Sequence, residues 1–169
     1  MNAIQLILGN GCSLLAMITD SISATRKTAK GVLLVQSLSQ LIYCIGTLLL
    51  KGYSGAVQNV VSILRNFVAI RKIESKPLEW TLVLAGVVLG IACNNLGLVG
   101  YLPIAANLQY TLSVFKFKDN ERALKISFMI SVGLFGLFNL FILNFVGGFC
   151  NFFVMFTTLV AFLKQEKSR

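Results

Sequence analysis

The stretch GYSGAVQNVVSILRNFVAI, residues 52–70, is apolar overall but carries a regular series of small and polar residues. These residues recur at intervals of three and four, which places them on one face of an α-helix. They are Gly55, Gln58, Asn59, Ser62, Arg65 and Asn66. The pattern predicts a helix with a polar inner face and an apolar outer face.

The whole chain has the composition of an integral membrane protein. Of its 169 residues, 56% are apolar and only 12% are charged, which is too little charge to cover a soluble globule of this size. Charged and turn residues divide the sequence into apolar stretches that approach the roughly 20 residues needed to cross a bilayer. These stretches are residues 4–23, 31–50, 54–71, 80–96, 98–115, 123–142 and 145–163. The predicted fold class is therefore an all-α integral membrane protein with seven transmembrane helices.

The distribution of Lys and Arg predicts the orientation of the chain. Thirteen of these 15 residues lie on or beside the connections after the first, third and fifth stretches or in the C-terminal tail, which leaves Lys51 and Arg65 elsewhere. By the positive-inside rule the N-terminus is outside and the C-terminus cytoplasmic, as expected for a bacterial cytoplasmic membrane. Because the basic residues lie between apolar stretches, the net charge of +9 does not indicate a nucleic-acid partner.

An internal repeat relates the two halves of the sequence. An offset of 92 residues aligns Gly55-Ala-Val-Gln-Asn59 with Gly147-Gly-Phe-Cys-Asn151, and Thr47 with Asn139. Two copies with the same orientation need an odd linking helix between them. We therefore predict a first three-helix bundle over residues 1–72, a linker with the fourth helix over 73–96, and a second bundle with the tail over 97–169.

Parallel repeats of this kind place a substrate site near the membrane midplane, between the halves. Asn59 and Asn151 are the first candidates, because an amide offers donors and an acceptor without a fixed charge. The further candidates for substrate binding are Gln58, Ser62, Gln40, Tyr43, Thr47 and Asn139. The alternative is that these polar side chains only hydrogen-bond neighbouring helices to one another.

Two charged residues and one proline have separate predicted roles. Asp20 and Arg65 lie near the same end of their spans, so we expect a structural or inner-gate ion pair. A direct role in anion or proton handling, and snorkelling of Arg65 to the headgroups, are the alternatives. Pro103 lies early in the fifth span and is a candidate hinge, with a plain kink as the alternative.

The sequence contains no pattern typical of an enzyme. It has no histidine, no nucleophile or nucleotide motif, and no paired carboxylates within the apolar stretches. Its four cysteines lack metal-binding spacing. We therefore expect no catalytic residues, no metal and no cofactor.

Three short motifs resemble a known family. Gly52-Tyr-Ser-Gly-Ala-Val-Gln-Asn59, Ser62-Ile-Leu-Arg65-Asn66 and Gly100-Tyr-Leu-Pro103-Ile-Ala are similar to the YgjV-type bacterial inner-membrane protein family over nearly the whole chain. The three-one-three helix plan also resembles the SWEET sugar facilitators and related PQ-loop proteins. That resemblance implies pocket roles for Asn59 and Asn151 and a hinge at Pro103.

The function expected from these features is transport. A small carrier would move a small polar solute, such as a sugar, nucleoside or vitamin precursor, by rocking its two bundles without ATP. The alternative is a non-transporting receptor or scaffold, or a subunit of a larger membrane complex. The expected partners are the solute and membrane lipid, and a homo-oligomer is left open.

Overall fold

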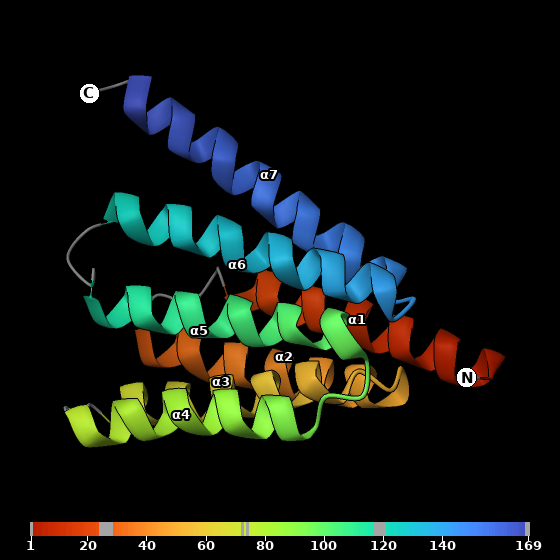
Figure 1. The fold of residues 1–169 in the computed structure, drawn as a ribbon. Coiled ribbons are helices and arrows are strands. Elements are labelled where there is room, and N and C mark those ends of the chain that lie inside the picture. The colour runs from red at the N-terminus through yellow and green to blue at the C-terminus, as the bar shows by residue number, and fades with distance from the viewer. Residues whose placement is uncertain (1, 24–28, 72, 74, 117–120, 168–169) are drawn as a thin grey trace.

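The computed structural model describes residues 2–23, 29–71, 73, 75–116 and 121–167. In these residues it contains seven α-helices, one short 3₁₀ helix and no strand (Figure 1). The elements are α1 (Ala3–Ser23), α2 (Ala29–Leu49), α3 (Tyr53–Ile70), α4 (Lys76–Ala92), η1 (Gly97–Gly100), α5 (Tyr101–Lys116), α6 (Glu121–Phe141) and α7 (Phe145–Lys167). The predicted all-helical class is confirmed, with one helix on each of the seven apolar stretches.

The apolar length of the individual helices supports membrane crossing only in part. Within the described residues, α1 alone contains a segment long and apolar enough to span a bilayer by itself, Ala3–Asp20. Shorter apolar segments occur in α2, α6 and α7, over Leu33–Leu49, Ile126–Phe141 and Phe145–Val160. The polar inner face explains the difference, since residues such as Asn59 and Arg65 interrupt the apolar runs.

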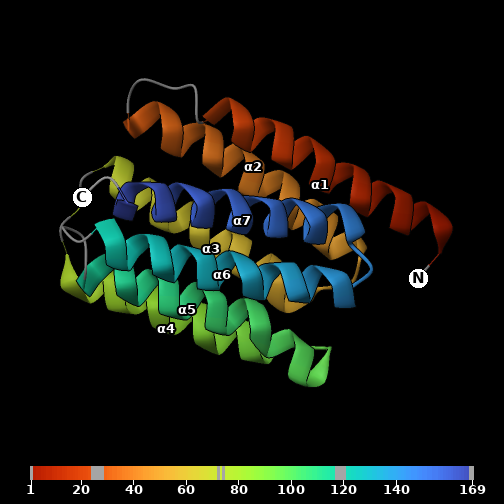
Figure 2. The same ribbon diagram turned by 90° about the horizontal axis from the view of Figure 1, so that it is seen from above.

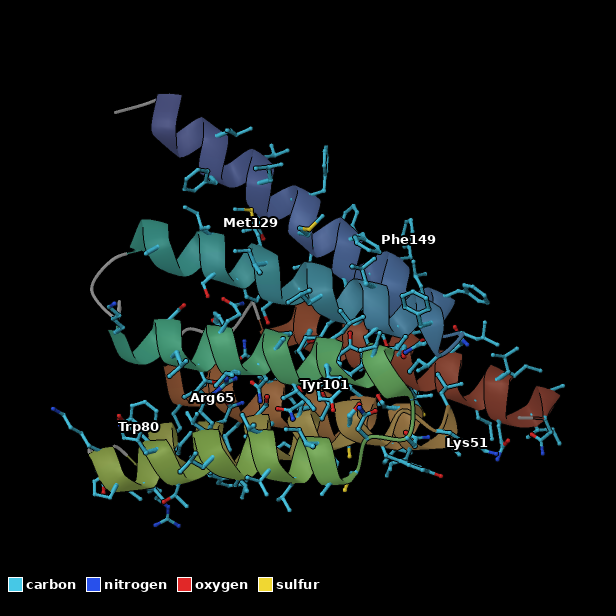
Figure 3. All side chains as sticks on the ribbon, viewed as in Figure 1. Lys51, Arg65, Trp80, Tyr101, Met129 and Phe149 are labelled. Carbon is cyan, nitrogen blue, oxygen red and sulfur yellow. The ribbon has the colours of Figure 1, made fainter. Side chains whose placement is uncertain are left out.

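The surface and the interior have the reverse of the polarity expected for a soluble protein. Among the described residues, fifteen buried side chains are polar and only twelve are apolar. Large apolar side chains are exposed instead, with Leu98 at 87% and Phe149 at 72%. Figure 3 shows Phe149 on the outer side of α7 and Trp80 on the outer side of α4. This arrangement fits a protein whose exterior faces lipid.

The helices form two groups of three. In the first group α2 packs between α1 and α3, and in the second α6 packs between α5 and α7 (Figures 1 and 2). The groups meet where α1 packs on α7 and where α3 packs on α5, while α4 packs against α3 and α5. In the repeat, α1 corresponds to α5 and α3 corresponds to α7. The contact of α1 with α7 is therefore equivalent to the contact of α5 with α3.

The sequence offset of 92 recurs in the backbone. Lys51 and Leu143, which follow the second helix of each group, both have positive φ, 59° and 61°. The next amides, of Gly52 and Asn144, donate 2.8 Å hydrogen bonds to the carbonyls of Thr47 and Asn139 respectively. A left-handed residue after the last helical turn is a common way to end a helix. The two helix-to-helix turns therefore have the same hydrogen-bonded conformation.

The break between the fourth and fifth helices falls where Asn94, Asn95 and Gly97 predict it. Gly97 has a φ of +57°, and the Asn94 side chain closes the turn by donating to the Gly97 carbonyl at 2.8 Å. The same side chain accepts from the Leu96 amide at 3.0 Å. Because glycine adopts positive φ without steric cost, the chain reverses here and enters η1 and then α5.

Candidate functional site

A cavity of about 530 Å³ lies between the two groups of helices. All helices except α4 contribute to its wall. The first group contributes Met17, Asp20, Gln36, Gln40, Tyr43, Thr47, Gly55, Asn59, Ser62, Arg65 and Asn66; the second contributes Asn107, Tyr110, Phe128, Ser131, Val132, Phe135, Phe138, Asn139, Cys150, Asn151 and Val154. The volume is within the range of about 300–1,000 Å³ typical of small-molecule sites.

Most of the residues singled out from the sequence line this one cavity. Residues from five helices come together there: Asp20, Gln40, Tyr43, Thr47, Asn59, Ser62, Arg65, Asn139 and Asn151. Gln58 and Pro103 do not line it. The structure therefore gives these last two residues different surroundings from the other candidates.

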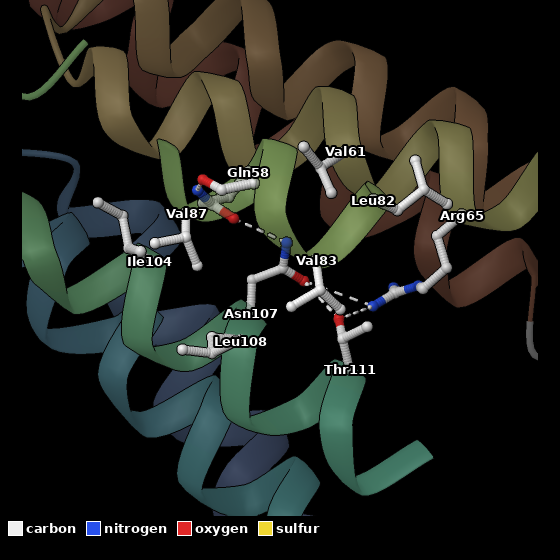
Figure 4. Close-up of a pocket in the computed structure, with 11 residues that line it drawn as sticks. Gln58, Val61, Arg65, Leu82, Val83, Val87, Ile104, Asn107, Leu108 and Thr111 are labelled. Carbon is white, nitrogen blue, oxygen red and sulfur yellow. Dashed lines mark hydrogen bonds between the residues drawn. The ribbon is translucent and has the colours of Figure 1, made fainter. Parts of the chain in front are cut away.

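Gln58 joins three helices away from the cavity. Its side chain is 1% exposed, and its Nε2 donates to the Gly86 carbonyl of α4 at 2.8 Å. Its Oε1 accepts from Asn107 Nδ2 of α5 at 2.8 Å (Figure 4). A buried amide with both ends satisfied in this way holds α3 against α4 and α5.

Pro103 lies at the start of its helix, as the third residue of α5. The first four amides of a helix have no carbonyl partner within it, so a proline there removes no helical hydrogen bond. Pro103 therefore removes no hydrogen bond from α5, and its role as a hinge stays a prediction. A hinge at this residue would act at the junction of η1 with α5.

The contacts of Arg65 run to α5. Its Nη1 lies 3.4 Å from Asn107 Oδ1 and 3.3 Å from Thr111 Oγ1 (Figure 4). Its Cζ lies 5.6 Å from the centre of the Tyr110 ring. Asp20 lines the same cavity and accepts a hydrogen bond from the Ser39 hydroxyl. The expected Asp20–Arg65 pair is not among the contacts that Arg65 makes.

The two repeat-equivalent asparagines, Asn59 and Asn151, both line the cavity. Within the described part of the chain, neither the Asn59 nor the Asn151 side chain makes a hydrogen bond, and the same holds for Gln36 and Gln40. An amide that only linked helices would need such a bond, since an unsatisfied amide in an apolar interior costs about 2–7 kcal/mol. The hydrogen-bonding groups of these amides are thus available to water or to a solute in the cavity.

Some wall residues were not singled out from the sequence. Asn107 and Tyr110 of α5 are two of them, and their helical spacing of three places them on one face of the helix. Phe128 and Phe135 of α6 are two more, and they are offset by 92 from Gln36 and Tyr43. Applying the repeat to the polar face of the second helix would have identified both phenylalanines.

One end of the molecule is closed by paired contacts between the groups. Asn10 Nδ2 of α1 donates to the Leu143 carbonyl at 3.0 Å, and Asn10 Oδ1 accepts from the Val146 amide at 3.0 Å. In the other half, Asn95 Nδ2 donates to the Lys51 carbonyl at 2.8 Å. Lys51 and Leu143 are the repeat-equivalent turn residues. We call these contacts of Asn10 and Asn95 the paired asparagine contacts, and this end of the molecule the turn end.

An apolar cluster lies beside these contacts at the turn end. Its buried members are Leu50, Phe138 and Ile142, against which Leu6, Leu96, Val99 and Leu102 pack. The Phe138 ring lies so close to Gly55 that a Cβ at Gly55 would be 2.5 Å from its Cε1. At the opposite end α7 diverges from α6 (Figure 1). The cavity is thus bounded by apolar packing at the turn end, while the helices spread apart at the other end.

An all-helical fold with an apolar exterior and a polar internal cavity defines the class of helical integral membrane proteins. The model of the bacterial inner membrane protein family YgjV matches residues 7–169, and the chain belongs to that family. The family resemblance inferred from the sequence motifs is thereby confirmed, and with it the bacterial inner membrane as the location of the family. Comparisons with curated proteins and with solved structures found no match. The similarity to SWEET facilitators therefore rests on the sequence alone.

Proposed function

We propose that the protein is a carrier that moves a small polar solute across the bacterial inner membrane through the cavity between its two helix groups. One observation carries the proposal. Asn59 and Asn151, equivalent under the repeat, line a single cavity of about 530 Å³, and their side-chain amides have no hydrogen-bond partner among the residues that the structure describes. A site built from both groups suits a mechanism in which relative movement of the groups opens it to either side.

The proposal includes the seven-span topology, with the N-terminus outside and the C-terminus in the cytoplasm. The turn end then faces the outside, and the end where α7 diverges faces the cytoplasm. The groups form parallel repeats that rock about the cavity. The paired asparagine contacts support this, because a pseudo-two-fold movement of one group would release both of them together.

The test is solute flux into liposomes that contain the purified full-length protein. A panel of radiolabelled sugars, nucleosides, nucleobases and vitamin precursors is offered to the wild-type protein, Asn59→Ala and Asn151→Ala. Loss of one hydrogen bond worth about 0.5–1.5 kcal/mol weakens apparent affinity about 2- to 12-fold. Asn2→Ala is the control, because Asn2 is exposed just before α1 and its side chain accepts a hydrogen bond from the Gln5 amide, away from the cavity.

Two results would contradict different parts of the proposal. Saturable binding of a panel member without flux would favour the receptor alternative. Flux that is unchanged in both Asn59→Ala and Asn151→Ala would remove the cavity as the solute path. Oligomeric state is measured on the same detergent preparation by native mass spectrometry, which also detects a copurifying subunit.

A further inference from the structure

The two walls of the cavity occupy equivalent positions but differ in chemistry. On α2 and α6, residues offset by 92 face the cavity in matching sets. Three positions are polar in the first group and apolar in the second: Gln36, Gln40 and Tyr43 against Phe128, Val132 and Phe135. Ser62 of α3 and Val154 of α7 differ in the same direction. At these positions the first group offers hydrogen bonds, whereas the second offers aromatic and aliphatic surface beside its polar residues Asn107, Ser131, Asn139 and Asn151.

The polar wall suits a ligand with a hydrogen-bonding edge. The side-chain amides of Gln36 and Gln40 lie one helical turn apart on α2 and have no partner in the described part of the chain. Each presents a donor and an acceptor side by side. That pairing is complementary to the adjacent carbonyl and N–H groups of an amide, lactam or carboxamide.

The opposite wall suits a flat ring. Phe128 and Phe135 lie two turns apart on α6, and the Tyr110 ring lies 5.7 Å from the Phe128 ring at an angle of 57°. Aromatic side chains bind planar heterocycles by stacking, whatever the identity of the base. Among the described residues that line the cavity, Asp20 and Arg65 are the only charged ones, and their formal charges cancel. This charge balance favours a neutral ligand.

These features discriminate between the candidate solutes. A free sugar carries hydroxyl groups around its whole ring, and those turned towards Phe128, Val132 and Phe135 would lose water without gaining a partner. A nitrogen heterocycle with one amide-like edge satisfies both walls at once. Building on the proposed carrier function, we propose that the solute is a neutral planar nitrogen heterocycle, as the free base or as an uncharged riboside.

The test is equilibrium binding of radiolabelled uracil, nicotinamide and glucose to the purified full-length protein in detergent. We expect uracil or nicotinamide to bind at least tenfold more tightly than glucose. Phe128→Leu keeps an apolar side chain but removes the ring, and should weaken heterocycle binding at least threefold. Phe149→Leu is the matched control, since Phe149 is 72% exposed on the outer face of α7.

A second variant adds a hydrogen-bonding group to the apolar wall without a large change of shape. Phe135→Tyr introduces the side chain of its repeat equivalent, Tyr43, and should narrow the preference for uracil or nicotinamide over glucose. Glucose binding as tightly as either heterocycle, or a flux-competent solute of another class with no heterocycle binding, would overturn this inference and leave the carrier function standing. Absence of both binding and flux for the whole panel would overturn both.

Discussion

Gln58 and Asn59 are neighbouring amides that should respond in opposite ways to substitution. In Gln58→Leu, two buried hydrogen bonds disappear, one to the Gly86 carbonyl and one from Asn107 Nδ2, both 2.8 Å long. At about 0.6–1.5 kcal/mol per bond, the variant should lose about 1–3 kcal/mol of stability. For a protein of this size, that lowers the melting temperature by about 2–12 °C.

Asn59→Ala provides the internal comparison. Its side chain faces the cavity and has no hydrogen-bond partner among the described residues, so its melting temperature should stay within about 2 °C of the wild type. Solute binding should be weakened in Asn59→Ala. The assay is thermal melting of both variants in the same detergent, monitored by a thiol-independent dye. Equal destabilisation of the two variants, or a Gln58→Leu protein as stable as the wild type, would refute the assignment of Gln58 to packing and Asn59 to the cavity.

Three further changes test other parts of the structure. Ser54 has a buried hydroxyl with no partner among the described residues, so Ser54→Ala should raise stability by about 1 kcal/mol in the same melting assay; a lower melting temperature would show that the hydroxyl is bonded. Gly55→Ala would bring a Cβ within 2.5 Å of Phe138 and should cost about 1–3 kcal/mol, whereas Gly11→Ala, with no atom within 4 Å, should be neutral; equal effects would contradict the close packing at the turn end. A green fluorescent protein fused to the C-terminus should fluoresce in intact cells and an alkaline phosphatase fused there should be inactive, and the opposite pair of results would reverse the proposed topology.

The number and position of the helices followed from the sequence because membrane length and turn chemistry act locally. The stretch predicted at 145–163 begins where α7 begins, and the predicted break at Asn94, Asn95 and Gly97 separates α4 from η1. The same offset of 92 pairs Lys51 with Leu143, and both residues have positive φ in the structure.

The sequence did not show which of the neighbouring polar residues bonds to other helices and which faces the cavity. Gln58 and Asn59 lie on the same polar face, and only the rotation of α3 against α4 and α5 decides which amide is bonded and which faces the cavity. The role of Pro103 depended on where α5 begins, which is three residues later than the sequence indicated. For the two amides the deciding contacts come from other helices and leave no local pattern in the sequence.

The position of Phe128 and Phe135 in the cavity wall was also not predicted, because phenylalanine in an apolar stretch is expected to face lipid. Phe128 and Phe135 differ from exposed residues such as Phe149 only by their position on the helix. Reading the repeat position by position, as well as for identical residues, would have paired them with Gln36 and Tyr43. The repeat offset alone identifies the equivalent positions, and the sequence already shows that they are polar in the first group and apolar in the second.

The central claim is that the cavity is reached from alternate sides of the membrane, and Cys150 offers a native reporter because it lines the cavity. With Cys12, Cys44 and Cys93 replaced by serine, Cys150 is exposed to a charged methanethiosulfonate reagent in right-side-out and inside-out vesicles.

We expect labelling at least tenfold faster from the cytoplasmic side, and a gain of labelling from the outside when Asn10 and Asn95 are both changed to alanine. Labelling from neither side in either protein, or labelling from the outside that the double substitution leaves unchanged, would contradict alternating access through this cavity.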